Sequence, residues 1–210
     1  MTILDCHTHH AAPQPEGVIS VTPAEATALG SSAGQLYSVG IHPWETLEAP
    51  SERLWADLER AAELPFVVAI GECGVDTLKG GPLFRQLQVL KRQIELSERL
   101  GKPLILHDVK AHDILTGLRR DLAPKQDWVI HGFRGKGSVA KMLLDAGMYL
   151  SFGEKFNPEA LAIVPAGRLL AETDESPLPI GEIIATLETA AGRPLRNEIA
   201  QTSSRIFLRN

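Results

Sequence analysis

Histidine and carboxylate residues recur in this sequence directly after short apolar runs. Six of them are candidate metal ligands: His7, His9, Glu72, His107, His131 and Asp174. A single histidine in such a place is more often a hydrogen-bonded structural residue than a ligand, so the inference depends on the six occurring together. Imidazole and carboxylate ligands suit zinc or another first-row divalent ion. The sequence therefore predicts a metal centre.

The spacing of these residues suggests how one or two ions would be held. His7 and His9 stand two residues apart, which places both side chains on one face of a strand. A bridging carboxylate such as Glu72 can serve two ions separated by about 3.5–4 Å. We expect one ion on His7, His9, Glu72 and Asp174, and the other on Glu72, His107 and His131. Zinc, manganese and magnesium are the candidate ions.

Two such ions would favour hydrolysis, because they lower the pKa of a shared water and neutralise charge on the scissile group. Three residues are assigned catalytic roles. Asp174 is the candidate general base, Glu72 holds the ions, and His42 is a substrate-orienting or acid-side group.

Eight apolar runs bounded by turn residues are the candidate strands that must position these side chains. They cover residues 2–6, 17–21, 36–41, 66–71, 103–107, 128–131, 148–152 and 168–172. Amphipathic stretches predict helices at residues 51–64, 83–100, 112–122, 138–146, 180–191 and 197–208. The stretch 22–34 is too short for a long helix with two loops.

Strands that alternate with helices predict parallel pairing, and eight such units close into a TIM-type (β/α) barrel of the α/β class. All strand C-termini of a barrel open on one face, so the dispersed ligands would converge there. With 210 residues against about 250 for a typical barrel, we expect a compact version with one or two reduced helices. The rival, an open doubly wound sheet, lacks support because no Gly-rich phosphate motif is present.

Composition indicates a single domain over residues 1–210, since no linker or low-complexity tract divides the chain. A net charge of −5 is unlike that of proteins that bind nucleic acid by bulk electrostatics. The apolar runs are too short to span a membrane, and no signal peptide is apparent, so we expect a cytoplasmic protein. Cys6 and Cys73 are expected to be buried, inert thiols.

Six short motifs in this order make the chain similar to the TatD-type metal-dependent hydrolases of the amidohydrolase superfamily. The motifs are Asp5-Cys-His7-Thr-His9, Gly40-Ile-His42-Pro43, Gly71-Glu72-Cys-Gly74-Val-Asp76, Pro103-Leu-Ile-Leu-His107, His131-Gly-Phe133-Arg-Gly135 and Glu172-Thr-Asp174. Gln86, Leu90 and Gln93, before the fifth strand, also fit. The resemblance implies a metal-dependent phosphodiesterase, often a deoxyribonuclease, whose substrate is a phosphodiester and possibly DNA.

The chain departs from the family pattern on the substrate side. Ala11 stands where the family has an acidic residue, and Trp44 stands where it has a second histidine of Gly-x-His-Pro-His. Asp108-Val109 replaces Ser-Arg, and Arg134 lies within a stretch that is commonly Cys-Phe-Ser. The metal-binding motifs are intact, so the departures bear on the substrate rather than on the metal.

Positive residues in the loops of the same face could bind a phosphate: Lys79, Lys110, Arg134, Lys136 and Lys155. Arg134 is preferred because a guanidinium grips two phosphate oxygens, and Lys136 follows two residues later. Trp44 either packs over the mouth of the site or stacks on a base.

Other polar residues near the motifs receive supporting or solvent-facing roles. Asp5 is expected to orient a ligand imidazole without binding metal. Asp76 and Gly74 are expected to shape the loop after Glu72, and His10 and His112 to face solvent.

Two other functions stay open. A small-molecule amidohydrolase or lactonase could use the same metal centre, although Glu72 occupies the strand end where a carbamylated lysine would sit. A non-catalytic metalloprotein would have no need for an open, charged mouth lined with ligands. No membrane and no obligate protein partner is indicated.

Overall fold

A computed structural model describes residues 2–29 and 34–208. Its eight parallel strands pair in sequence order. The strands are β1 (Asp5–Thr8), β2 (Gly17–Val21), β3 (Leu36–Val39), β4 (Val67–Asp76), β5 (Leu104–Val109), β6 (Trp128–Ile130), β7 (Tyr149–Phe152) and β8 (Leu169–Ala171). A parallel bridge between Thr8 and Asp174 brings the first strand to the last. The predicted TIM-type barrel is confirmed as a nearly closed one.

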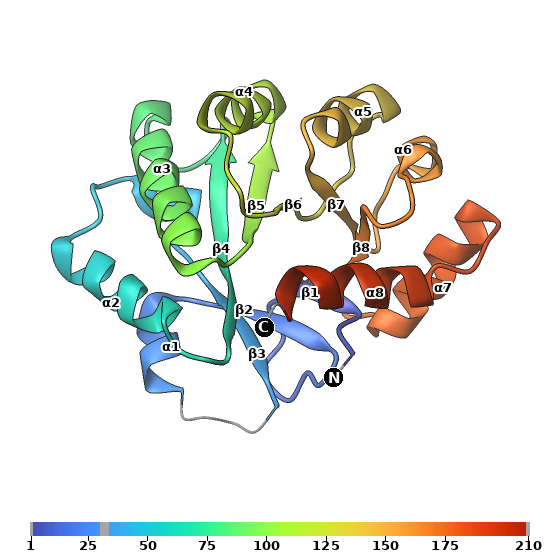
Figure 1. Cartoon of the computed structure of the whole chain (residues 1–210), viewed down its shortest axis with the longest axis horizontal. Helices are drawn as coiled ribbons and strands as arrows, with labels where there is room; N and C mark the ends of the chain where they lie inside the picture. The colour runs from blue at the N-terminus through green and yellow to red at the C-terminus, as the bar shows by residue number, and fades with distance from the viewer. Residues whose placement is uncertain (1, 30–33, 209–210) are drawn as a thin grey trace.

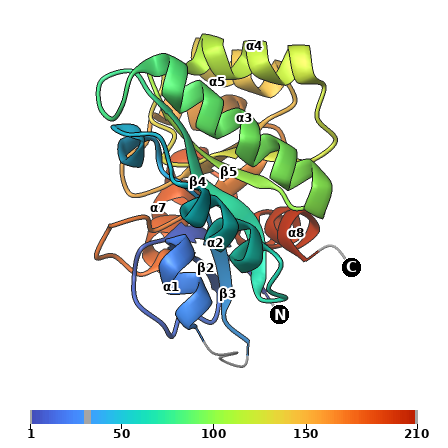
Figure 2. The same cartoon turned by 90° about the vertical axis from the view of Figure 1, so that its left-hand side faces the viewer.

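The helices surround the strands, as Figure 1 shows, from α1 at the lower left to α7 at the right, with α8 crossing below. They are α1 (Pro23–Ala28), α2 (Glu52–Ala62), α3 (Leu83–Leu100), α4 (His112–Leu122), α5 (Gly137–Asp145), α6 (Pro158–Ile163), α7 (Ile180–Ala191) and α8 (Arg196–Phe207), with a 3₁₀ turn η1 (Pro43–Thr46). Figure 2 turns the side formed by α1, α2 and α3 to the viewer. Within the described part of the chain, no helix is long and apolar enough to cross a membrane.

The small size of the barrel comes from its reduced connections. The predicted stretch 22–34 contains only the six-residue α1, and its residues 30–33 lie outside the described part of the chain. α6, which the sequence did not predict, also has six residues, and no helix joins β1 to β2 in the described residues 9–16. The expectation of reduced helices is therefore confirmed.

The largest difference from the predicted elements is in β4, which continues to Asp76 instead of ending at residue 71. β1 is also displaced, since it begins at Asp5 and extends through Thr8. His7 and Glu72 consequently lie within strands rather than after them, and His107 lies inside β5 rather than at its end. The apolar run was the wrong marker for these ends, because the strands continue into the polar residues of the site.

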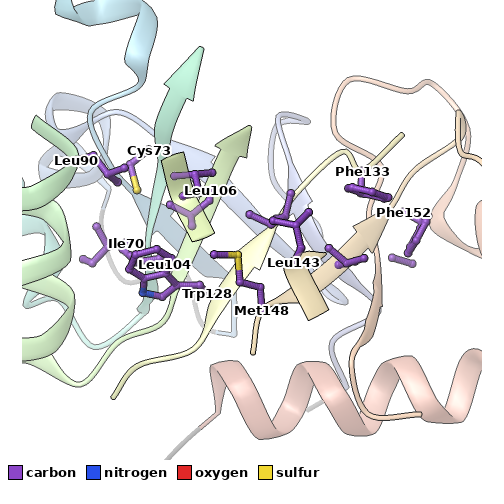
Figure 3. Packing of buried hydrophobic residues seen from close by; sticks show 14 of the residues in the cluster. Ile70, Cys73, Leu90, Leu104, Leu106, Trp128, Phe133, Leu143, Met148 and Phe152 are labelled. Carbon is purple, nitrogen blue, oxygen red and sulfur yellow. The ribbon is translucent and has the colours of Figure 1, made fainter. Parts of the chain in front are cut away.

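Two layers of apolar side chains fix the direction in which the site residues point. The outer layer lies between the strands and the helices, and Figure 3 shows part of it, including Leu104, Leu106 and Trp128. The inner cluster contains Ile105, Val129 and Leu170, each from a different strand. Neighbouring residues alternate between the two clusters, as expected of strand side chains.

Because of this alternation, the inward-pointing positions continue from the apolar cluster to the polar end of the barrel. Two residues beyond Ile105 is His107, and two beyond Val129 is His131. Ile206 and Phe207 of α8 join the inner cluster. The interior is therefore an apolar layer with one polar end, where the candidate metal ligands meet.

Candidate metal centre

Glu72 reaches the centre of the site through an irregularity of β4. The register of β4 against β5 shifts between Ile70 and Cys73, so the regular alternation is interrupted at Glu72. Gly74 then pairs with His107 at very close range, since a Cβ at this glycine would lie 2.1 Å from the His107 carbonyl oxygen. Only glycine permits this approach, which brings β4 and β5 together beside the Glu72 carboxylate.

One oxygen of Glu72 faces the two histidines of the first motif. Nε2 of His7 and Nε2 of His9 each lie 3.3 Å from Oε2. Asp174 completes this side, with Oδ1 3.9 Å from His7 Nε2 and 3.8 Å from His9 Nε2. Backbone hydrogen bonds hold the group, because the Asp174 N–H donates to the His7 carbonyl and the His9 N–H donates to that of Asp174.

The other oxygen, Oε1, faces three histidines from three different strands or loops. Nδ1 of His107 lies 2.6 Å away, Nε2 of His131 2.8 Å, and Nε2 of His42 3.0 Å. The structure thus brings all six predicted ligands together around Glu72. His42 is an additional member that the sequence assigned to substrate rather than to metal. Its position after the third predicted strand could have shown that it joins the group around Glu72.

The donor atoms form overlapping groups in which all of them lie within 4.8 Å of one another. These groups are His7, His131 and Asp174; His7, His9 and Glu72; and His42, Glu72 and His107. Nitrogen and carboxylate donors at such distances fit a zinc-like divalent ion. The buried Nε2 of His7 has no hydrogen bond among the described residues, as expected of a metal-ligand atom.

The charge of Glu72 is compensated by its histidines. Burial alone would raise the pKa of Glu72, but the charge of His131 and hydrogen bonds from His107, His131 and His42 hold this pKa well below its usual range. His131 responds in the opposite sense: burial would lower its pKa, yet Glu72 and Glu172 raise it well above normal. A divalent ion would replace the histidine protons as the compensating charge, so its binding would release protons.

Buried carboxylates behind the ligands support them. Asp5 contacts no imidazole within the described part of the chain, so the prediction that it orients one is wrong. It accepts hydrogen bonds from the N–H and hydroxyl of Thr173 at 2.9 and 2.6 Å, and from the His7 N–H at 3.4 Å. Glu172 is the residue that supports an imidazole, since its Oε1 lies 3.5 Å from His131 Nδ1 and accepts the Gly132 N–H at 2.6 Å. The inward position two residues after Leu170 could have identified it.

Two glutamines of α3 fix the strand ends on the other side of the site. The Gln93 amide accepts the Ile41 N–H at 2.8 Å and donates to the Ile41 carbonyl at 3.0 Å, directly before His42. The Gln86 amide makes the same pair of bonds to the backbone of Asp76, at 2.8 and 2.9 Å. These buried amides continue the backbone pairing of the sheet into α3 and set the positions of His42 and Asp76.

Trp44 lies across the edge of this group. Its Nε1 donates to Asp76 Oδ2 at 2.7 Å, and its ring meets those of His42 and His107 edge to face. The Lys79 ammonium lies 3.1 Å from the ring centroid. Trp44 thus packs at the mouth of the site, and its stacking on a base stays a prediction. Asp76 accepts the Leu78 and Lys79 N–H groups, so its expected role in shaping the loop is confirmed.

A pocket of about 540 Å³ opens beside the ligands. His107, His131 and Asp174 line it, together with Lys110 and Arg134. Arg134 also borders a second pocket, which Lys155 shares. Lys136 lies instead at the N-cap of α5, exposed, and is not among the residues that line either pocket.

Two histidines expected to face solvent have partners. His10 Nε2 lies 2.7 Å from the Ser176 carbonyl oxygen, and His112 Nδ1 lies 2.6 Å from Asp108 Oδ2. Both are partly buried, so they face solvent only in part. Cys6 and Cys73 are buried as predicted, and burial raises the pKa of each thiol.

Comparisons with known proteins identify the family of the chain. The family model described as TatD related DNase matches residues 18–202. The chain is 34% identical over 169 residues to the uncharacterized metal-dependent hydrolase YjjV of Escherichia coli (strain K12), covering 75% of this chain and 64% of that protein. It is 34% identical over 148 residues to a 3′-5′ ssDNA/RNA exonuclease TatD of Erwinia billingiae, covering 65% of this chain and 56% of that protein.

The chain therefore spans between about half and two thirds of the length of these two curated relatives. Among solved structures, that of E. coli YjjV superposes with a TM-score of 0.82 at 23% identity, covering 99% of this chain and 98% of that one. This likeness supports the barrel fold.

Proposed function

Because this chain belongs to the TatD-related DNase family, we propose that it is a metal-dependent hydrolase that cleaves phosphodiester bonds, with a nucleic-acid strand as its preferred substrate. The observation that carries the proposal is the Glu72 carboxylate, whose two oxygens face separate groups of imidazoles. A relative named as an exonuclease on single-stranded DNA and RNA supports the choice of bond.

In this proposal, Glu72 and the side chains around it would hold one or two divalent ions. His7, His9 and Asp174 would hold one of them, and His107, His131 and His42 the other. When bound, such ions supply an activated water and neutralise charge on the phosphate. Asp174 is partly exposed at the pocket, where it can accept the proton of the attacking water.

The pocket residues supply the means of binding a phosphodiester despite the net negative charge of the chain. Arg134 and Lys110 place two cations on its wall, next to His131 and His107. A guanidinium can contact two phosphate oxygens at once. Lys136 would meet a longer strand outside the pocket, and the partly exposed Trp44 would stack on a base.

The test is turnover after reloading the metal-free protein with zinc, manganese or magnesium. Bis(p-nitrophenyl) phosphate and single-stranded DNA should be hydrolysed, and a lactone should not. His107→Ala should lose phosphodiester turnover while its circular dichroism spectrum is retained. Lactone turnover without phosphodiester turnover would overturn the proposed substrate class. Turnover that needs no metal would overturn the proposed chemistry.

A further inference from the structure

The loop between β5 and α4 carries an aspartate–histidine pair beside the metal centre. The Asp108 carboxylate is 1% exposed and lies 2.6 Å from Nδ1 of His112. Its other oxygen accepts the Ala111 N–H at 3.1 Å. The carboxylate is thus fixed by the backbone, and it fixes the imidazole in turn.

The imidazole so held belongs to the pocket wall. His112 lines the pocket that His107, His131 and Asp174 also line. Nδ1 is occupied by Asp108, and Nε2 has no hydrogen-bond partner in the part of the chain that the structure describes. The side chain is 30% exposed, so the free nitrogen is accessible to a molecule in the pocket.

A carboxylate that accepts from Nδ1 holds the tautomer and ring orientation of a histidine and leaves Nε2 for proton exchange. Cleavage of a sugar–phosphate ester expels an alkoxide, which needs a proton donor. His42 is poorly placed for this, because its Nε2 lies 3.0 Å from Glu72 and its Nδ1 accepts the Trp44 N–H.

We propose that His112 is the catalytic acid that protonates the leaving oxygen, and that Asp108 is its positioning residue. The proposal rests on the phosphodiesterase function above. The water oxygen bonds to phosphorus and its proton passes to Asp174. The bond from phosphorus to the leaving oxygen breaks, and this oxygen keeps the electron pair and takes the Nε2 proton. Solvent then takes the proton from Asp174 and returns one to Nε2 of His112.

The nature of the leaving group provides the test. A p-nitrophenolate leaves without protonation, whereas a sugar alkoxide does not. His112→Gln should therefore lower kcat on a thymidine dinucleotide by about 10²-fold or more, while turnover of bis(p-nitrophenyl) phosphate stays within a few-fold of wild type. Replacing the leaving oxygen of the dinucleotide by sulfur should restore much of the loss. Metal content should be unchanged.

Asp113→Asn is the matched control, since Asp113 is exposed in the first turn of the same helix and does not line the pocket. It should behave as wild type on every substrate. Asp108→Asn should show the same leaving-group dependence as His112→Gln. Long-range ¹H–¹⁵N spectra of histidine should show that the Nδ1-protonated form of His112 is lost in this variant.

Equal losses on both substrates in His112→Gln would overturn the acid role and leave a structural one. Full activity on the dinucleotide would overturn any role in turnover. If the wild-type protein hydrolyses neither phosphodiester, the proposed function itself fails, which is a different result from a loss confined to the dinucleotide.

Discussion

At the scale of single residues, the site depends on one buried carboxylate. Glu72 is 7% exposed and contacts five imidazoles, so its charge is compensated within a small volume that excludes most water. An uncompensated charge there would be costly. Protonated histidines and the proposed ions would therefore compete to supply the positive charge that balances Glu72.

Glu72→Gln tests this dependence. The amide keeps the size of the side chain but cannot offer a second anionic oxygen, so we expect loss of bound metal and a fall in phosphodiester turnover of about 10²-fold or more. Elemental analysis and kinetics measure the two losses. Normal metal content in a folded Glu72→Gln protein would show that the carboxylate does not hold the ions.

Asp174→Asn tests whether the carboxylate of Asp174 is needed for turnover without disturbing its backbone conformation. Asp174 has a positive φ of 54°, a conformation that asparagine also tolerates. We expect an unchanged melting temperature of the metal-free protein, because the fold keeps its backbone, and a loss of turnover of about 10²-fold, because the proton acceptor is gone. The neighbouring Glu175→Gln is the control and should keep its activity. Substantial turnover in Asp174→Asn would remove this residue from the proposed mechanism.

The residues that gather around Glu72 could be predicted from the sequence because metal-binding residue types stood out after apolar runs. That they bind metal stays a prediction. The Asp108–His112 pair could not be predicted, because a buried carboxylate and a solvent-facing one look the same in a sequence. Glu172 was missed, and only its inward position two residues after Leu170 could have identified it. The role of Asp5 was wrong for a related reason: its partner, Thr173, is 168 residues away.

At the scale of elements, α3 is the clearest case of a helix that positions the site. Its bounds at Leu83–Leu100 were predicted from periodicity alone. The function of Gln93 depends on the strand end that it meets, which periodicity does not reveal. The end of β4 was also beyond prediction, since the strand continues past its apolar run through Glu72 and Gly74.

Gln93→Leu should therefore weaken both the fold and the site. The Ile41 N–H and carbonyl would lose their partners in a buried place, so we expect the free energy of unfolding to fall by at least about 2 kcal/mol. His42 should lose its fixed position, which lowers turnover. Urea unfolding and kinetics measure these effects. Gln88→Leu, on the exposed face of the same helix, is the control. An equal loss in both variants would argue against a specific role of the hydrogen bonds between Gln93 and Ile41.

At the scale of the whole molecule, the proposed ligands come from β1, β4, β5 and the segments that follow β3, β6 and β8. Binding of metal would therefore join the two ends of the barrel, where β1 meets the residues after β8. The barrel and its reduced helices were predictable from the order of strands and helices. The register shifts that complete the site were not, because they depend on contacts between strands.

Metal removal should lower the stability of the whole barrel. Metal that binds the folded chain at a hundred times its Kd adds about 2.7 kcal/mol, which corresponds to roughly 5–10 °C in melting temperature for a domain of this size. Calorimetry with and without a chelator measures the shift, and adding zinc back should reverse it. The same melting temperature in both conditions would mean that no ion binds with useful affinity.

The most direct measurement of the central claim is anomalous diffraction from crystals of the zinc-loaded protein. We expect one or two anomalous peaks at about 2.0–2.2 Å from the Glu72 carboxylate oxygens and from nitrogen atoms of the surrounding histidines. Strong zinc peaks elsewhere, with none within coordinating distance of Glu72, would contradict the account.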